Sequence, residues 1–340
     1  MQRDPRTNDT GRVAVIIVNY NAGAMLRECL LSLQAQSERP ARVLVMDNGS
    51  HDDSMELCQA AFPWVEFHRL NANLGFARAN NIAVELVSDC EWIALLNPDA
   101  FPDKRWLQVF IENARQYPEF DTFASCMVSA DGSDVLDGTG DCYRVDGIAW
   151  PRYQGVSLSK LPQGIEEVFA PCAGAGFYKR AAFKEVGGFS ERYFCYHEDV
   201  DLGFRLRLHG SRCRFLRDAI VRHVGSAITG KGSDFSVYHV QRNLVWTYFR
   251  NMPAPYVWLY LPAHFLVNIG SLLWFTLYWR RWIVLKAKKD AVKALPSIWR
   301  ERKQIQADRH VPVRLLMGAM EHGTILSSVF PKVIKRLRCG

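Results

Sequence analysis

The sequence predicts an α/β protein with a mostly parallel central sheet flanked by helices, followed by a distinct helical region at the C-terminal end. Three observations lead to this prediction. Apolar strand-like segments alternate with helix-like segments from Val13 to Ala100, polar residues follow the strands, and the composition changes at Arg250. The 49% apolar and 23% charged residues are typical of a globular protein and exclude a collagen-like or wholly disordered chain. A mean hydropathy of −0.11 excludes a polytopic transporter.

The alternation of apolar strand-like and helix-like segments predicts the residue range of each strand and helix. The segment VAVII, which starts at Val13, has the consecutive apolar residues of a strand buried on both faces. Further strands are expected at 41–50, 65–70 and 91–100, and helices at 24–36, 53–61 and 76–87. This order predicts parallel strands joined by right-handed crossovers. Short strands and glycine-rich turns follow from 123 to 176, and helical spacing returns from 177 to 210.

The chain divides into a polar leader at 1–11, a domain at 12–250 and a C-terminal region at 251–340. No Asp, Glu, Lys or Arg occurs from Asn251 to Trp279, a stretch of 29 residues. From Arg280 to Gly340 there are 15 lysines and arginines against four aspartates and glutamates, a net charge of +11, whereas the preceding residues sum to −4. The leader lacks the apolar run of a signal peptide, and the nine cysteines include no CxxC pair. Both features favour a cytoplasmic domain with reduced thiols.

Polar residues gather where three of the expected strands end, at Asn19–Asn21, Asp47–Ser50 and Asn97–Asp99. In open α/β sheets, ligands bind at these carboxyl ends. The Asp47 carboxylate can accept a hydrogen bond from the imide of a pyrimidine ring or from a ribose hydroxyl. Its alternative role is to stabilise a turn through its own backbone.

A second group of candidate residues lies where the third strand meets a helix. Gly75 permits a close approach of the backbone to a ligand, and Arg78 at a helix N-terminus suits an anionic diphosphate. An ordinary loop with a solvated arginine is the alternative.

Six motifs in this order resemble the family 2 glycosyltransferases of the GT-A fold. They are VIIVNYN, VMDNGSHDDS, NLGFARANN, LLNPDA, GGFSERYFCYHEDVDLGFRLRLHG and RHVGS. The similarity covers Arg12 to Met252 and is greatest to the rhamnosyltransferase-type members that build bacterial surface polysaccharides. Each motif alone is unspecific, but their order and spacing together identify the family.

The resemblance implies a binding site for the nucleotide of a sugar donor. The residues that match are Asn19, Tyr20, Asn21, Asp47, Asn73, Gly75, Arg78, Asn81 and Asn97. It also implies a divalent cation, Mg²⁺ or Mn²⁺, because Asn97-Pro98-Asp99 occupies the position of the family's DxD motif. Here the first acid is Asn97, which leaves Asp99 as the one carboxylate and weakens the expected metal site. His223, in RHVGS, is the expected second ligand, and a purely structural histidine is the alternative.

The resemblance further implies that Asp199 is the general base and that Glu198 orients the acceptor or supports Asp199. Acids at a helix N-terminus also favour the helix dipole, so capping is the alternative. Asp201 is expected to pair with Arg205 at i,i+4 spacing. Residues expected to line the sugar and acceptor pocket are Gly174, Ala175, Gly176, Gly188 and Phe189, although glycines also form ordinary turns.

The uncharged stretch at 251–279 is long enough for one membrane helix, but Pro253, Pro255 and Pro262 interrupt it. A single crossing would place the +11 tail outside the cell, against the positive-inside rule, and two crossings would need about 40 residues. We therefore expect a segment that dips into or lies along the inner leaflet of the bacterial inner membrane, with both ends cytoplasmic. A true span and a buried helical pair are the alternatives. The basic tail would then meet anionic lipids.

Together these features predict an inverting, metal-dependent glycosyltransferase. It would move a sugar from a nucleotide diphosphate donor to a hydroxyl of a polyprenyl-diphosphate-linked glycan. The expected donor is dTDP-rhamnose, which supplies L-rhamnose. UDP-linked galactofuranose, hexoses or N-acetylhexosamines are alternative donors.

A nucleotidyltransferase would need a glycine-rich phosphate loop with a lysine near the first strand, and VNYNAGAMLRE lacks one. A lectin-like scaffold would not need Asp99 and Asp199. A nucleic-acid partner is not expected, because no nucleic-acid-binding motif accompanies the basic tail. The oligomeric state stays open.

Overall fold

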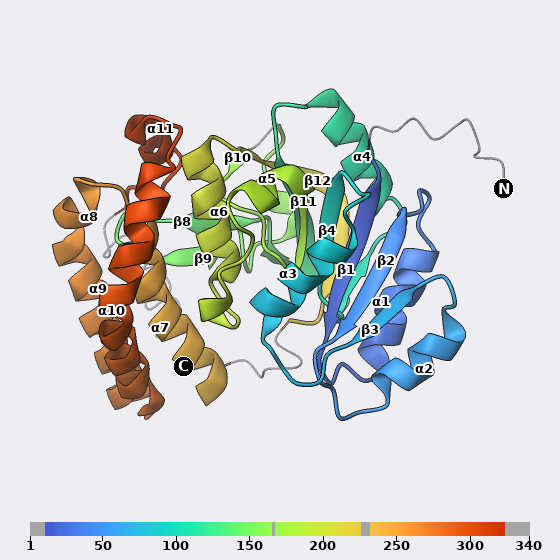
Figure 1. Cartoon of the computed structure of the whole chain (residues 1–340), viewed down its shortest axis with the longest axis horizontal. Helices are drawn as coiled ribbons and strands as arrows, with labels where there is room; N and C mark the ends of the chain where they lie inside the picture. Colours follow the sequence, from blue (N-terminus) through green and yellow to red (C-terminus); the bar gives the residue numbers. More distant parts are fainter. Residues whose placement is uncertain (1–10, 165–166, 226–231, 324–340) are drawn as a thin grey trace.

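The central feature of the computed structural model is a ten-stranded mixed sheet between two layers of helices (Figure 1), with residues 11–164, 167–225 and 232–323 described. Its first half contains β1 (Val13–Asn19), α1 (Ala24–Gln34), β2 (Arg42–Asp47), α2 (Ser54–Ala61), β3 (Glu66–Arg69), α3 (Phe76–Leu86) and β4 (Trp92–Leu96). The expected elements are all present, with ends that differ by a few residues. Strands β3, β2, β1 and β4 are adjacent and parallel, as predicted.

The second half of the sheet is mixed rather than parallel. It comprises β5 (Ala100–Pro102), α4 (Trp106–Gln116), β6 (Thr122–Ser129), β7 (Leu136–Gly138), β10 (Glu167–Val168), β11 (Ala175–Lys179), α5 (Arg180–Glu185), α6 (Glu198–His209) and β12 (Cys213–His223). Strand β11 runs antiparallel to both β4 and β6, while β12 is parallel to β6. The residues Phe177–Lys179, where helical spacing was expected, therefore form a strand, because they complete hydrogen bonding between two central strands. The two-stranded ribbon β8 (Asp141–Tyr143) and β9 (Ala149–Pro151) lies beside this sheet.

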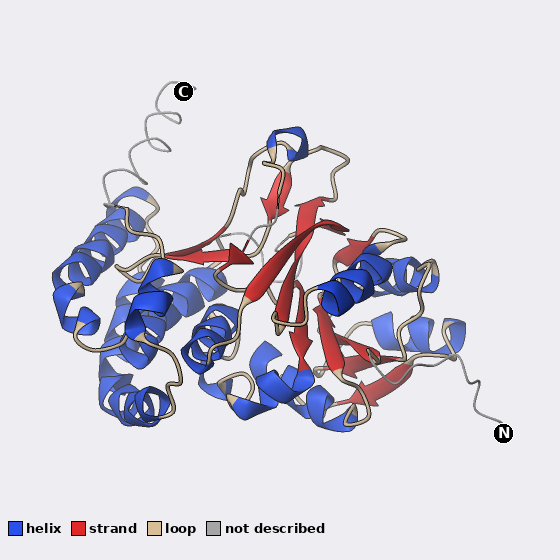
Figure 2. Cartoon of the chain, turned by 90° about the horizontal axis from the view of Figure 1, so that it is seen from above, coloured by secondary structure: helices blue, strands red, loops and turns tan. Residues whose placement is uncertain are grey.

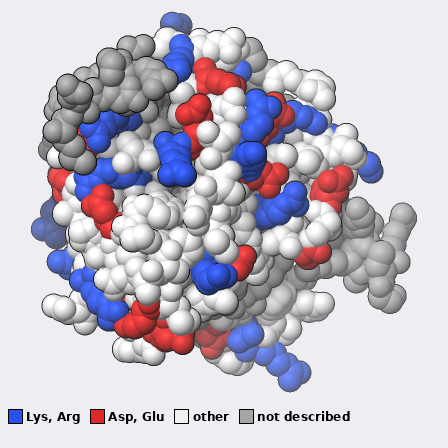
Figure 3. Space-filling model, turned by 90° about the vertical axis from the view of Figure 1, so that its right-hand side faces the viewer, with Lys and Arg blue, Asp and Glu red and all other residues white. Residues whose placement is uncertain are grey.

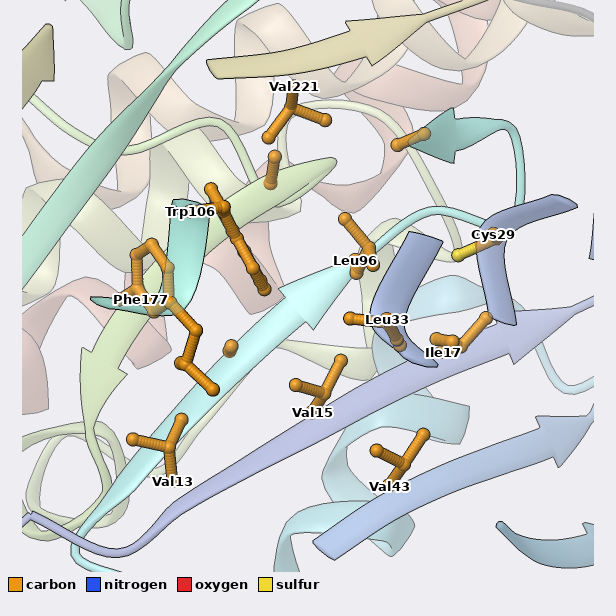
Figure 4. Close-up of a cluster of buried hydrophobic side chains, with 14 of the residues drawn as sticks. Val13, Val15, Ile17, Cys29, Leu33, Val43, Leu96, Trp106, Phe177 and Val221 are labelled. Carbon is orange, nitrogen blue, oxygen red and sulfur yellow. The ribbon is translucent and has the colours of Figure 1, made fainter. Parts of the chain in front are cut away.

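The strands of the parallel half bury side chains on both faces. Val13, Val15 and Ile17 point toward α1 and α4, where they join a core that includes Trp106 and Phe177 (Figure 4). The intervening residues Ala14 and Ile16 point to the opposite face, which α3, α5 and α6 cover. This two-sided burial explains the uninterrupted apolar runs in the sequence.

Helix α6 lies between the sheet and the C-terminal helices (Figure 1). Its Leu202 and Leu206 face the sheet core, whereas Val200, Phe204 and Leu208 belong to a second core with the C-terminal region. The helix before that region is α7 (Asp234–Asn251), and the region itself contains α8 (Tyr256–Leu259), α9 (Leu261–Leu273), a π-helical turn (Trp274–Tyr278), α10 (Ile283–Ala307) and α11 (Val313–Gly318). These helices gather at one end of the molecule, away from β2 and β3 (Figure 1), and the view from above shows the same helical end (Figure 2).

The C-terminal region is not a loosely attached tail within the part of the chain that is described. Helix α10 packs along α7, with Trp246 Nε1 donating to Ala291 O at 3.2 Å. Leu316 and Met317 of α11 are buried in the core that holds Tyr143 and Phe204. Two basic residues of α10 are also used internally, since Lys288 donates to Gln241 O and Arg302 to Phe249 O. The expected domain boundary therefore falls within a continuous packed structure.

The uncharged stretch forms an exposed apolar surface. Residues Leu261–Tyr278 make a helix long and apolar enough to cross a membrane, and only 17% of that window is buried. The exposed large apolar side chains here are Trp258, Leu259, Phe265, Leu266, Ile269, Leu273, Trp274, Leu277, Tyr278, Trp279 and Trp282, and we call this set the apolar stripe. On the face at the opposite end of the molecule, by contrast, charges of both signs are intermingled (Figure 3).

Candidate active site

The carboxyl ends of the parallel strands form one wall of the candidate site. The buried Asn19 amide donates to Asp47 Oδ1 at 3.0 Å, to Ser50 Oγ at 3.1 Å and to Ser54 Oγ at 2.9 Å. This contact holds the Asp47 carboxylate at the end of β2 and ties the ends of β1 and β2 together. Asn21 continues the attachment, because its Oδ1 accepts from the backbone of His51 at 2.8 Å.

A pair of asparagines fixes the loop after β3. Asn48 Nδ2 donates to Asn73 Oδ1 at 2.9 Å, and Asn48 Oδ1 accepts from the backbone of Leu74 at 2.8 Å. Both residues, together with Tyr20 of the β1 turn, line a cavity of about 590 Å³. The geometry therefore brings these parts of the expected nucleotide site together.

Other residues assigned to the donor or sugar sites have structural contacts instead. Gly75 has φ 86°, and a Cβ there would come within 2.6 Å of the Phe194 ring, so the group that approaches it closely is Phe194. Asn81 forms two hydrogen bonds with the backbone of Phe189, at 2.8 and 2.9 Å. A side chain at Gly188 would collide with Asn81. Within the described residues, the cavity wall includes Phe194 but not Gly75, Asn81, Gly188 or Phe189.

Phe189 and the 174–176 segment show why a pocket assignment from glycines is incomplete. Phe189 is buried and packs edge-on against Phe183 at 5.3 Å, so it belongs to the core. Ala175 is also buried in the core, and Gly176 gives room for Cys172 O. Of the three residues in that segment, Gly174 is the one on the cavity wall.

Arg78, which was also expected to contact the nucleotide, is exposed and is not among the residues that line the cavity, and its Nε lies 3.5 Å from Glu191 Oε2. Its guanidinium is therefore already paired with a carboxylate of this chain, although that pair is solvent-accessible. An exposed pair of this kind stabilises the fold by about 1 kcal/mol or less, so it is exchangeable for an anionic ligand.

The candidate metal ligands lie close together at the C-terminal end of β12. His223 Nε2 lies 3.4 Å from Asp99 Oδ1, and His223 Nδ1 lies 2.7 Å from Asp137 Oδ2. Although burial alone would lower the pKa of His223, its contacts with Asp137 and Asp99 raise it to about 9. Nε2 is shielded from solvent and has no hydrogen-bond partner of good geometry.

The candidate catalytic acids follow a strained loop. Phe194, Tyr196 and His197 all have positive φ, at 68°, 64° and 67°. Such a conformation is unfavourable for side chains of this size and requires compensation elsewhere. The buried Asn243 of α7 supplies it, donating from Nδ2 to the carbonyl oxygens of Tyr193, Cys195 and Tyr196 at 3.1, 3.0 and 2.7 Å.

Asp199 and Glu198 begin α6 and both line the cavity. Asp199 Oδ1 accepts from Val200 N at 2.8 Å and Oδ2 from Ala173 N at 3.2 Å. Burial nevertheless raises the pKa of Asp199, and burial together with the Asp199 charge raises the pKa of Glu198. Glu198 Oε2 is buried without a partner, so one carboxyl oxygen is left for a group in the cavity.

Asp201, the third acid, is structural. Burial would raise its pKa, but Arg205 and Arg250 hold that pKa well below its usual range. Arg205 Nε donates to it at 2.9 Å, as the i,i+4 spacing predicts. Arg250 Nη1 and Asn251 Nδ2 add hydrogen bonds from the end of α7.

Two acidic residues that the sequence analysis did not single out lie beside these groups. Asp137 contacts His223, and the buried Asp141 lies within 4.8 Å of Asp199 and of the Cys172 sulfur. Burial and the Asp199 charge raise the pKa of Asp141. Both come from VLDGTGDCY, where acids beside glycines suggest nothing more than turns. Asn243 carries no sequence signal at all, since it is one polar residue in a long helix.

Comparison with known proteins decides the family. The profile described as "Glycosyl transferase family 2" matches residues 14–187, and that of "Glycosyl transferase family group 2" matches residues 154–288. The chain belongs to the family 2 glycosyltransferases. This glycosyltransferase is 29% identical over 255 residues to the N-acetylglucosaminyl-diphospho-decaprenol L-rhamnosyltransferase of Mycobacterium tuberculosis, covering 68% of this chain and 82% of that protein. It is 28% identical to the rhamnosyltransferase WbbL of Escherichia coli, covering 60% and 80%.

Solved structures confirm the GT-A-like fold of this family 2 glycosyltransferase. TarS 1–349 of S. aureus in complex with UDP-GlcNAc superposes with a TM-score of 0.57 at 18% identity, covering 87% of this chain and 88% of TarS 1–349. The mannosyltransferase PcManGT of Pyrobaculum calidifontis, in complex with GDP-Man and Mn²⁺, superposes with a TM-score of 0.51 at 17% identity, covering 91% and 83%. At these identities the likeness describes the fold.

Proposed function

We propose that this glycosyltransferase transfers a sugar, with inversion, from a nucleotide diphosphate donor to a hydroxyl of a lipid-linked glycan in bacterial surface polysaccharide synthesis. The observation that carries the proposal is that one cavity is lined both by the residues expected to bind the donor diphosphate and by the expected general base. Asn97 and Asp99 lie on one wall, and Asp199 projects from the other. A donor diphosphate and an acceptor hydroxyl would thus meet in the same cavity.

Asp199 is the proposed general base. Its raised pKa makes it a stronger base than an exposed carboxylate, and the hydrogen bonds from Ala173 and Val200 fix its direction. It would take the proton of the acceptor hydroxyl as that oxygen attacks the anomeric carbon opposite the leaving diphosphate. No covalent enzyme intermediate is needed for such a displacement. Glu198, with one free oxygen, would accept a hydrogen bond from the acceptor.

The residues around Asp99 fit a divalent cation. The shielded Nε2 of His223 faces the Asp99 carboxylate and has no other partner, which is the arrangement expected of an imidazole and a carboxylate that share an ion. Asp137 would orient the imidazole from its other nitrogen. We propose Mg²⁺ or Mn²⁺, with Mn²⁺ better suited to a nitrogen ligand. Such an ion neutralises charge on a departing diphosphate.

L-Rhamnose from dTDP-rhamnose is the proposed donor. The support is the similarity of the chain to two bacterial rhamnosyltransferases. A UDP-linked sugar is the second candidate, supported by the UDP-GlcNAc complex of TarS. The Mycobacterium relative acts on an N-acetylglucosaminyl-diphospho-decaprenol, which supports a polyprenyl-diphosphate acceptor here.

The proposed location is the cytoplasmic face of the inner membrane, with the apolar stripe against the lipid. Leu266, Leu273 and Leu277 follow one another at spacings of seven and four residues and are 62%, 50% and 72% exposed, so they form one face of the helix. An apolar surface of this extent on a soluble protein marks an interaction site. Trp258, Trp274 and Tyr278 suit the headgroup level of a bilayer. The stripe would lie on or dip into the inner leaflet.

Activity is tested with purified enzyme, Mn²⁺ and a polyprenyl-diphosphate N-acetylglucosamine acceptor. Separate reactions receive dTDP-rhamnose, UDP-GlcNAc, UDP-galactose or UDP-galactofuranose, and product is followed by mass spectrometry. Transfer from dTDP-rhamnose that Asp199→Asn abolishes supports the proposal. Transfer from a UDP sugar alone would replace the donor assignment, and no transfer from any donor would contradict the acceptor assignment.

Membrane binding is tested by flotation with vesicles containing anionic lipid. The double variant Leu266→Glu/Leu277→Glu should lose flotation, whereas Leu57→Glu, on α2 and 57% exposed, should not. These substitutions are better than truncation after Arg250, because truncation also removes the α10 contacts that support α7. Wild-type protein that fails to float would contradict the membrane location.

A further inference from the structure

A group of metal-binding side chains lies at the opposite end of α6 from the catalytic acids. Glu185 ends α5, His209 ends α6, and His310 lies in the connection between α10 and α11. One ligand atom from each of these residues lies within 4.8 Å of the other two. Since α6 has 12 residues, this group is about 18 Å from the start of the helix, where Glu198 lies.

One ring nitrogen of His209 lacks a hydrogen-bond partner. Its Nδ1 is shielded from solvent and forms no hydrogen bond, although Glu185 Oε1 lies 3.9 Å away. The ring of His310 lies 4.5 Å from that of His209, inclined by 52°. A buried nitrogen without a partner costs free energy, and an ion between the three groups would remove that cost.

We propose that Glu185, His209 and His310 bind a zinc ion that fastens the α10–α11 connection to the end of α6. Two imidazoles and one carboxylate form a known three-residue set for Zn²⁺, with water in the fourth position. Mg²⁺ and Ca²⁺ prefer oxygen ligands, so this donor set discriminates against the ions that suit Asp99.

The backbone already holds the ligands near one another. His310 N donates to Leu208 O at 2.9 Å, which anchors the connection beside His209. Glu185 and His310 are exposed, so their side chains can rotate from the present separation to the roughly 2 Å bond lengths that zinc requires. The bound ion would link three segments far apart in sequence.

Such a link has a structural consequence. The chain beyond His310 leads into α11, whose Leu316 and Met317 are buried against Tyr143 and Phe204. Zinc would therefore stabilise the packing of α11 on the catalytic domain. It would not take part in transfer, which occurs at the other end of α6.

The test is a zinc titration of full-length enzyme that has been freed of metal with a chelator. Excess Mg²⁺ is present throughout to occupy oxygen-rich sites, and a chromogenic zinc chelator competes for the ion. We expect zinc to bind this site in the wild type and to bind it more weakly in His310→Ala and in Glu185→Gln, by at least the roughly 10- to 100-fold that loss of an outer-shell partner costs a metal site. His51→Ala, an exposed histidine after β2, is the matched control and should bind as the wild type does.

Thermal unfolding gives an independent readout. Zinc should raise the unfolding midpoint of the wild type and of His51→Ala, but not of His310→Ala, because an ion that binds the folded state stabilises it by mass action. Equal zinc binding in all four proteins, or no binding in the wild type, would overturn the proposal. Neither measurement involves sugar transfer, so the outcome is separate from that of the proposed function.

Discussion

The two walls of the active-site cavity are built in different ways. The donor wall consists of turns at the ends of adjacent parallel strands, tied to one another by Asn19 and Asn48. The acid wall is a strained loop before α6, held by Asn243 and Arg250 from α7. Hydrogen bonds between the turns of adjacent parallel strands therefore hold the proposed nucleotide side, while side chains of α7 hold the proposed catalytic acids. The difference shows that α7 supports the loop and helix start that carry those acids.

The largest expected effect comes from the acid wall itself. Asp199→Asn keeps the shape of the side chain but cannot accept the acceptor proton, so transfer should fall about 100- to 10,000-fold. Binding of nucleoside diphosphate, which depends on the donor wall, should change little. Initial rates and calorimetry measure the two properties separately. The exposed Asp218→Asn is the control, and near wild-type turnover of Asp199→Asn would show that another group is the base.

The support from α7 is tested by Asn243→Ala. The carbonyls of Tyr193, Cys195 and Tyr196 each lose one hydrogen bond, at about 1 kcal/mol per bond. Tyr193 O keeps its hydrogen bonds from Arg242 and Cys195. The loop should relax and displace Asp199, lowering kcat on the order of 100-fold. The KM for donor should stay near its wild-type value because the donor wall is untouched. A proportionate loss of donor affinity would mean that the two walls are not independent.

The donor wall is tested through His223 and Asp137. His223→Ala should remove most of the metal-dependent gain in nucleoside diphosphate binding. Asp137→Asn, which alters the partner of the imidazole but leaves His223 in place, should weaken it roughly 10- to 100-fold. Calorimetric titrations with and without Mn²⁺ give both values. Unchanged metal enhancement in His223→Ala would return this histidine to a structural role, as for Asp201 on the other wall.

The smallest expected effect concerns Lys288 in α10, the helix that packs along α7. Burial lowers the pKa of Lys288 to about 7, from 10.5 in the unfolded chain. Between these values the unfolded state binds the extra proton, so the stability of the folded state should rise with pH from about 7 upward. We expect the wild type to gain on the order of 1 kcal/mol between pH 7 and 8.5, and Lys288→Met to lose this gain. Urea unfolding at the two pH values measures it, with the exposed Lys289→Met as control. A gain of the same size in Lys288→Met would show that Lys288 does not titrate in this range.

The difference between the two walls also explains which features of the fold and the site could be predicted from the sequence. Local periodicity predicted the parallel strands β1 to β4, and with them the positions of Asp47 and Asp99 at one edge of the sheet. Family motifs located Asp199 and His223, which the structure brings to the same cavity. Periodicity did not reveal that Phe177–Lys179 forms a strand or that Asn243 supports the acid loop, because both depend on contacts distant in sequence. Likewise, Asn81 and Phe189 belong to a recognisable motif, yet their contacts with each other hold the fold.

The attachment of α9 has a consequence for how the enzyme meets its substrate. His264 of α9 stacks on Tyr248 at 3.9 Å and contacts Asp146 O at 2.8 Å, and Asn268 accepts from Lys288 at 2.6 Å. The apolar stripe is thus fixed rigidly to the catalytic domain instead of hanging from a flexible tether. An enzyme resting on lipid through this stripe holds its cavity at a constant height above the bilayer. With the proposed membrane placement, the glycan would have to supply a hydroxyl at that height, so the number of sugars already attached would determine which acceptors react.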